Sequence, residues 1–131
     1  MKNIFITVSI LILLSTNSYA AGSSISSSTK VKTNYDKAVT FVKSAKKYEK
    51  KGKSKKANVE YKKALSLLIK SNEKKPNQAD TLNYLGFTTR KLGDYAGGEK
   101  YYLEGLAIEP MHNGINEYLG ELYVATNRIN L

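Results

Sequence analysis

The chain of 131 residues has no cysteine, no tryptophan, one histidine and two prolines. Without cysteine there is no disulfide, no thiolate zinc site, no thiol nucleophile and no lipidated-cysteine anchor. A single histidine excludes metal motifs that need a histidine pair and leaves little for acid–base chemistry. The hydrophobic fraction of 41% is high enough for a folded domain. The composition therefore favours a binding protein over an enzyme, and we expect neither a cofactor nor a metal ion.

The first twenty residues have the layout of a secretory signal peptide. A lysine at position 2 precedes an apolar stretch at 4–14, and small residues at Ser18 and Ala20 end the polar segment that follows. The apolar stretch is shorter than the roughly 20 residues that cross a membrane. We predict that residues 1–20 are removed near Ala20 and that the protein is periplasmic or secreted, with an uncleaved anchor as the alternative. The Ser-rich segment 21–33 is predicted to be a flexible leader.

Helical periodicity begins at Asn34. Apolar residues such as Leu82, Leu85 and Leu92 recur at intervals of three and four, and no stretch alternates for long enough to indicate a strand. The predicted class is therefore all-α. The expected helices cover residues 34–51, 54–73, 78–92, 95–108 and 114–126. The expected capping residues are Asn34, Ser54, Asn77, Asp94 and Asn113.

A 34-residue repeat connects two of these helices. Tyr84-Leu85-Gly86 recurs as Tyr118-Leu119-Gly120, and the sequence between them contains Gly98-x3-Tyr102-x2-Gly105 followed by Pro110. This helix–turn–helix unit resembles the tetratricopeptide repeat. The resemblance implies antiparallel helix pairs stacked as a short superhelical solenoid of about two and a half repeats over residues 34–131.

An earlier unit aligns with the same pattern through Ala45, Gly52 and Ala57-x3-Tyr61-x2-Ala64. Ala45 and Gly86 are 41 residues apart, seven more than the repeat, which predicts about two extra turns on the second helix of the first pair. A rival alignment pairs Gly52 with Gly86. We reject it because it places Lys51 and Lys55 on the packing face.

The chain stops at Leu131, where the second helix of a third unit would start. We therefore expect one apolar face of the last helix to lie uncovered, carrying Ile115, Leu119, Leu122 and Tyr123. Terminal repeats normally need a polar cap. One interpretation is that the repeat domain is incomplete at its C-terminus. The other is that this face binds a partner or a second copy of the chain, which would give self-association.

Charge is unequal along the chain, whose formal net charge is +10. Residues 30–75 hold 16 lysines and 4 acidic residues, whereas residues 76–131 hold 4 basic and 7 acidic residues. The densest basic patch comprises Lys43, Lys46, Lys47, Lys50, Lys51, Lys53, Lys55, Lys56, Lys62 and Lys63. This patch indicates either a solvated helix face or a site for a polyanion or an anionic membrane surface. Because the cations are nearly all lysine and the protein is expected to be exported, we do not expect nucleic acid as its partner.

The resemblance also implies a binding groove. In the tetratricopeptide family the first helices of the pairs form a concave face that holds extended peptides or partner helices. Projected onto this chain, that groove is lined by Lys46, Glu49, Asn83, Phe87, Arg90, Lys91, Glu117 and Glu121. Phe87 is expected to contact an apolar side chain of the peptide. The function that we expect is therefore a protein-interaction adaptor or scaffold of the cell envelope, and the polyanion site is the alternative. His112 is expected to be an ordinary surface residue.

Overall fold

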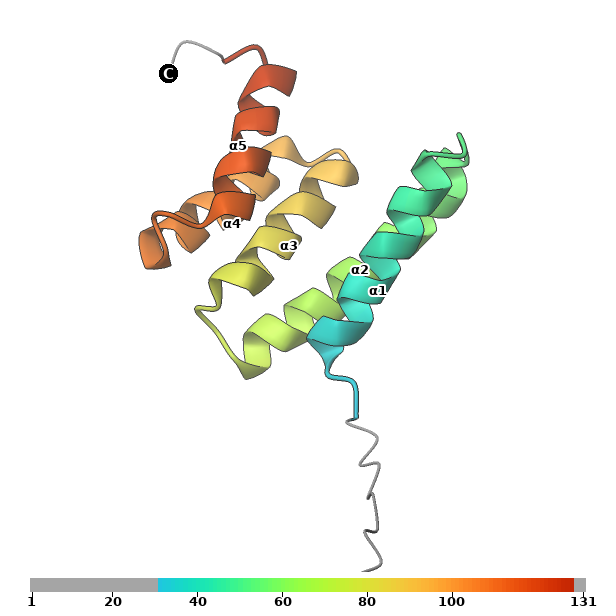
Figure 1. Cartoon of the computed structure of the whole chain (residues 1–131), viewed down its shortest axis with the longest axis horizontal. Coiled ribbons are helices and arrows are strands. Elements are labelled where there is room, and N and C mark those ends of the chain that lie inside the picture. Colours follow the sequence, from blue (N-terminus) through green and yellow to red (C-terminus); the bar gives the residue numbers. More distant parts are fainter. Residues whose placement is uncertain (1–30, 129–131) are drawn as a thin grey trace, which may run out of the picture.

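The computed structural model describes residues 31–128, and these residues form an all-α protein (Figure 1). Five helices occur in this range, with no strand: α1 (Asn34–Glu49), α2 (Ser54–Lys74), α3 (Ala79–Lys91), α4 (Tyr95–Ile108) and α5 (Asn113–Ala125). All five predicted helices are confirmed, with bounds that differ by at most two residues. The predicted signal peptide and most of the leader lie outside the described residues.

The helices form two hairpins and a fifth helix. α1 packs mainly against α2 and α3 against α4, while α5 packs against α4 and, less extensively, α3. α1, α3 and α5 lie on one side of the molecule in Figure 1, and α2 and α4 lie behind them. Three helices that are distant in sequence therefore share one face.

The same burial pattern recurs 41 residues apart in the two hairpins. Buried small or aromatic residues correspond in four pairs: Ala45 with Gly86, Ala57 with Gly98, Tyr61 with Tyr102, and Ala64 with Gly105. The turn glycines Gly52 and Gly93 share this offset, and both have positive φ angles of 66° and 100°. The rival alignment would match turn residue Gly52 with Gly86, which is buried within α3. α2 has 21 residues and α4 has 14, so the predicted seven-residue extension is confirmed.

Gly86 allows the closest helix contact in the second hairpin. A Cβ atom at this position would lie 2.5 Å from the Tyr102 ring, and the Tyr102 side chain is fully buried. Gly98 also lies close to α3, because its Cβ would be 3.0 Å from the carbonyl oxygen of Gly86. Gly86 and Gly98 are therefore explained by close packing of α3 against α4.

The helix caps agree with the prediction only at Asp94, which accepts a hydrogen bond from the Gly97 backbone N–H. α1 is capped by Thr33 in a capping box with Asp36, not by Asn34. His112 caps α5 instead of Asn113. In both cases the predicted residue is the first residue inside the helix, and the residue before it has the extended backbone that a cap requires. The helices α2 and α3 begin without a side-chain cap, so the predictions for Ser54 and Asn77 are also wrong.

The prediction of an uncovered apolar face on α5 is wrong for the residues named. Ile115 and Leu122 are fully buried, Leu119 is 7% exposed, and Tyr123 is half-buried. They cluster with Ala79, Tyr102 and Leu106, which α3 and α4 supply. The open side of α5 carries Gly120, around which a Cβ atom would meet nothing within 4 Å, and the exposed Val124.

Candidate functional site

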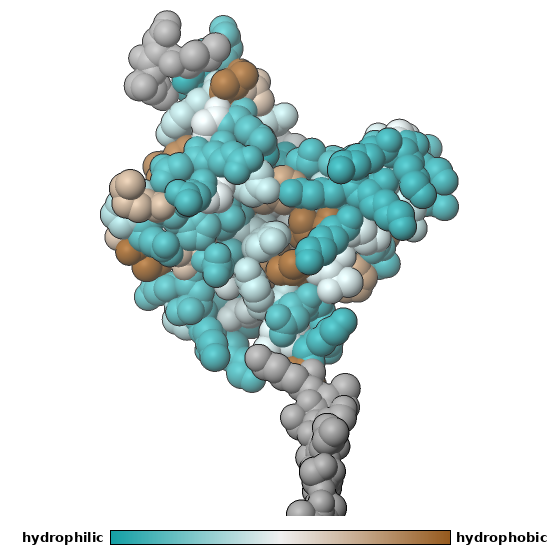
Figure 2. All heavy atoms as spheres, in the orientation of Figure 1, coloured by the Kyte–Doolittle hydropathy of each residue, from teal (hydrophilic) through white to brown (hydrophobic). Residues whose placement is uncertain are grey.

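The face shared by α1, α3 and α5 brings together most of the predicted groove residues. We call the connected set the inter-helix cluster. It contains six predicted residues and two additional tyrosines: Lys46, Glu49, Phe87, Arg90, Lys91, Glu121, Tyr61 and Tyr118. Hydrophobic residues reach the surface between α1 and α3, with hydrophilic residues around them (Figure 2).

An aromatic pair with a lysine above it forms the centre of the cluster. The rings of Phe87 on α3 and Tyr118 on α5 have centroids 4.9 Å apart. Lys46 extends from α1, where its Nζ lies 4.4 Å from the Phe87 ring centroid and donates a hydrogen bond of 3.0 Å to the Tyr118 hydroxyl. A cation over an aromatic face is favourable, and more so where water is partly excluded. Lys46 therefore links the first and last described helices.

Two ion pairs flank the aromatic centre. Lys91 Nζ lies 2.8 Å from Glu49 Oε1, and Arg90 Nη2 lies 2.7 Å from Glu121 Oε2. The Tyr61 hydroxyl donates a hydrogen bond of 2.9 Å to the other oxygen of Glu49. The pKa of Tyr61 is raised above its ordinary value. Burial is the larger cause, and the hydrogen bond to the Glu49 carboxylate is the second. The charged groups of the cluster therefore already have partners within the chain. A charged group of a ligand can bind one of them only by displacing its present partner.

The remaining predicted groove residues differ in their surroundings. Asn83 is only 8% exposed and lies against the start of α5, where a Cβ atom on Gly114 would be 2.7 Å from its Nδ2. Phe87 is also buried, at 4% exposure, so its ring mostly contacts the protein itself. Glu117 is exposed on α5, one turn before Glu121. Asn83 and Phe87 are therefore buried residues that shape this face, whereas Glu117 is exposed and a ligand can reach it directly.

Nine lysines of the predicted basic patch are exposed, and Lys46 alone turns into the inter-helix cluster. Two of these nine lysines lie above half-buried aromatic rings of α1. Lys56 Nζ is 5.9 Å from the centroid of the Tyr48 ring, and Lys63 Nζ is 5.4 Å from the centroid of the Phe41 ring. Lys63 also pairs with Glu60 at 2.8 Å. Apart from Lys46, the patch therefore lies on the exposed surface of the α1–α2 hairpin and outside the inter-helix cluster.

Sequence reasoning missed the role of Tyr118 and underestimated His112. Tyr118 belongs to the repeated Tyr-Leu-Gly motif and is three residues from Glu121, so helical spacing was the available signal. His112 is not an ordinary surface residue, since only 11% of its side chain is exposed. Its Nδ1 accepts a hydrogen bond from the Ile115 N–H, and its Nε2 lies 3.1 Å from Asp80. His112 therefore connects the starts of α3 and α5.

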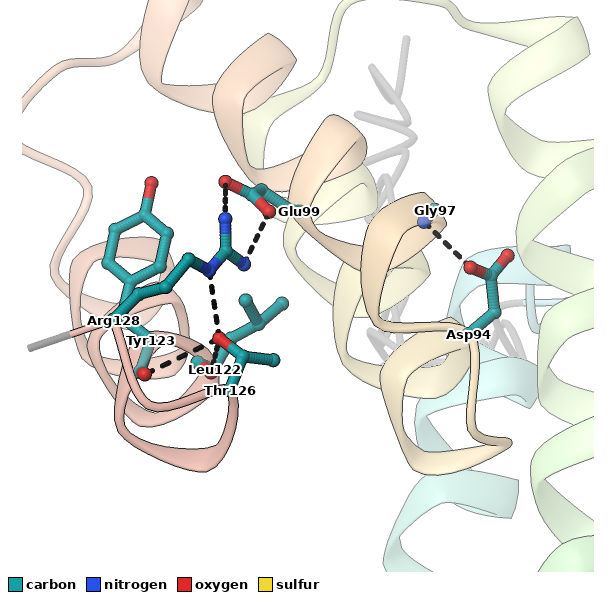
Figure 3. Close-up of polar contacts among 7 residues, drawn as sticks. All are labelled: Asp94, Gly97, Glu99, Leu122, Tyr123, Thr126 and Arg128. Carbon is teal, nitrogen blue, oxygen red and sulfur yellow. Dashed lines mark hydrogen bonds and ion pairs between the residues drawn. The ribbon is translucent and has the colours of Figure 1, made fainter.

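A further ion pair connects α4 with the residues after α5. Arg128 donates two hydrogen bonds to Glu99, of 2.7 and 3.1 Å, and a third from its Nε to Thr126 (Figure 3). The hydrogen bonds from Arg128 hold the pKa of Glu99 below its ordinary value. This contact fixes the end of α5 against α4.

The Glu99→Gln variant is expected to lower the melting temperature at pH 7 and to lose this effect in acid. A carboxyl group whose pKa is lowered by folding stabilises the native state above its ordinary pKa, and the contribution disappears as the pH falls through the lowered value. The difference in melting temperature between wild type and variant should therefore shrink towards zero as the pH falls through the lowered pKa of Glu99. Glu104→Gln, an exposed glutamate of the same helix, is the control. A difference that persists unchanged in acid would contradict the role of the pair.

Comparisons with known proteins give no relative for this chain: no family model, curated protein or solved structure matches it. Within residues 31–128, no helix is both long and apolar enough to cross a membrane. The described part of the chain also holds no group of three or more acidic or histidine side chains arranged to bind a metal ion.

Proposed function

We propose that this chain is an exported protein-interaction adaptor of the cell envelope, built as a short tetratricopeptide-like solenoid. The 34-residue recurrence of Tyr-Leu-Gly supports the repeat, as does the recurring burial pattern of the two hairpins. The layout of residues 1–20 supports export. Its binding surface is the face of α1, α3 and α5, and its ligand is an extended segment of a partner protein.

The observation that carries this proposal is the convergence of three helices on one cluster. Lys46 from α1, Phe87 and Lys91 from α3, and Tyr118 and Glu121 from α5 meet on the same side of the molecule. Such a surface is held by helix packing, so little of it must become ordered when a ligand binds. An acidic side chain of the ligand would replace Glu49 beside Lys91, and an apolar one would rest on the Tyr118 ring.

A photo-reactive residue tests where the partner binds. The cross-linker replaces Glu117 on the proposed face or, as the control, Glu104 on the exposed side of α4. Full-length protein is expressed in the cells that make it, irradiated, and washed at high salt, which screens binding that depends on surface charge alone. We expect one partner segment to be cross-linked from position 117 and not from position 104. Equal cross-linking at both positions would contradict the proposed surface.

The cross-linked segment is then synthesised as a peptide, and its affinity is measured by calorimetry. Lys91→Gln keeps the bulk of the side chain and removes the charge that the ligand needs. It is expected to weaken binding at least tenfold, or about 1.4 kcal/mol, in line with a lost charged hydrogen bond. Lys100→Gln on α4 makes the same change of charge away from the face and is expected to leave the affinity within about twofold. Equal affinities for the two variants would exclude Lys91 from the site.

A further inference from the structure

The far end of the α1–α2 hairpin is the most basic part of the described surface. Residues 47–56 contain one acidic residue and six lysines, all exposed: Lys47, Lys50, Lys51, Lys53, Lys55 and Lys56. We call this region the hairpin end. It appears in Figure 2 as a nearly unbroken hydrophilic surface at the upper right, away from α4 and α5.

The acidic residue within the hairpin end and the next one along α2 are both paired with other groups. Glu49 holds Lys91 and the Tyr61 hydroxyl, and Glu60 holds Lys63. Among the residues that the structure describes, none of the six lysines takes part in an ion pair. The positive charge of this end is therefore not neutralised within the described chain.

The helix dipole does not favour the lysines at the start of α2. Cations are favourable near a helix C-terminus, which suits Lys47 and Lys50 at the end of α1, and unfavourable near an N-terminus. Lys55 and Lys56 occupy the first turn of α2, which holds no acidic residue. A merely solvated helix face would not need cations at this position.

Apolar groups lie among the lysines. A hollow of about 350 Å³ is lined by Tyr48, Lys55, Lys56, Val59 and Glu60, and Val59 is 52% exposed. Lysines around a tyrosine ring and an aliphatic side chain suit the interface of a lipid bilayer. There the apolar groups enter the headgroup layer while the ammonium groups meet phosphates.

We propose that the hairpin end docks on the surface of a bilayer that contains anionic phospholipids. The lysines surround the end of two helices and do not line a groove, which fits an extended anionic surface better than a single peptide. The hairpin end contains no arginine, the residue that reads bases and phosphates of nucleic acids through bidentate contacts. This interaction goes beyond the adaptor function, since it uses none of the ligand-exchanging side chains of the inter-helix cluster.

Vesicle flotation of the full chain tests the proposal. Vesicles of phosphatidylglycerol mixed with phosphatidylcholine are compared with pure phosphatidylcholine, at low and at physiological salt. A second sample that starts at Ala21 holds every described residue and removes the contribution of the apolar stretch at 4–14. We expect both samples to prefer anionic vesicles and to lose affinity as salt rises. Equal binding to the two kinds of vesicle would overturn the proposal.

Charge reversal locates the surface. Lys51→Glu, Lys53→Glu and Lys55→Glu are combined in one variant, and three exposed lysines elsewhere are reversed in the control: Lys37, Lys70 and Lys100. Each lysine near an anionic bilayer strengthens binding about fivefold, so the first variant should lose at least about 100-fold and the control less than about tenfold. The reversals at Lys53 and Lys55 place acidic residues at the start of α2, where they favour the helix, and thermal melting of each variant checks that the fold is kept. Equal losses in both variants would show that net charge alone attracts the protein, which would overturn the assignment.

Val59→Ser separates docking from charge attraction. Apolar insertion is not screened by salt, so this variant should bind anionic vesicles about fivefold more weakly at every salt concentration.

Competition with polyglutamate and with single-stranded RNA tests whether another polyanion binds the hairpin end better than the bilayer does. Tighter binding to either of these than to the vesicles would replace the bilayer as the partner.

Discussion

Replacing Gly86 with alanine is expected to destabilise the protein by about 1–3 kcal/mol, the usual range for overpacking a core. The new Cβ atom would lie 2.5 Å from the ring of Tyr102 and within 2.9 Å of two further ring atoms. The ring cannot move aside easily because the side chain is fully buried between α3, α4 and α5. The free energy of unfolding, measured by urea denaturation, should fall, while its slope against urea concentration should change little.

Gly120→Ala is the matched control, because Gly120 occupies the same place in the second Tyr-Leu-Gly motif. Here the added Cβ would meet nothing within 4 Å, and the residue lies inside α5. Alanine is favoured over glycine in a helix by roughly 1 kcal/mol, so this variant should be as stable as the wild type or more stable. Equal destabilisation by the two substitutions would show that the glycines matter for the helix backbone and not for the contact with Tyr102.

The helices and the alignment of the hairpins could be predicted from the sequence because they depend on local patterns. Apolar spacing placed the five helices, and small residues at a fixed offset matched Ala45 with Gly86. The caps were harder, since Thr33 and Asn34 are adjacent residues that can both cap a helix. The capping residue is the one with extended backbone dihedral angles, which is Thr33 in this structure. The periodicity of the sequence does not determine these angles.

The candidate site could be predicted only in part, because it depends on how distant helices are placed. The tetratricopeptide resemblance selected residues that do meet, such as Glu49 with Lys91 and Arg90 with Glu121. The hydrogen bond from Lys46 to Tyr118 spans 72 residues of sequence and follows from the position of α5 relative to α1. The expected open face of α5 was wrong for the same reason, since Tyr102 and Leu106 of α4 pack against Ile115 and help to bury it.

Phe87→Ala is expected to cost about 3–5 kcal/mol of stability, the range for removing a buried phenylalanine side chain. Phe87 was predicted as a contact for the ligand, but it is 4% exposed and its ring lies between those of Tyr61 and Tyr118, at 5.9 and 4.9 Å. The loss should appear in urea denaturation of the free protein, with no partner present. Against a typical total stability of 5–15 kcal/mol, it would also lower the fraction of folded protein in cells.

Tyr118→Phe is the control that keeps the ring and removes only the hydroxyl that accepts the hydrogen bond from Lys46. It is expected to cost about 1 kcal/mol or less, the usual net value of one half-buried hydrogen bond. Weak partner binding by Phe87→Ala would therefore indicate a disturbed cluster and not a lost contact with the ligand. Weak binding by a Tyr118→Phe variant that is still stable would show that the ligand contacts the Tyr118 hydroxyl. A Phe87→Ala variant as stable as the wild type would mean that this ring does not hold α1, α3 and α5 together, and the proposed rigid binding face would lose its physical basis.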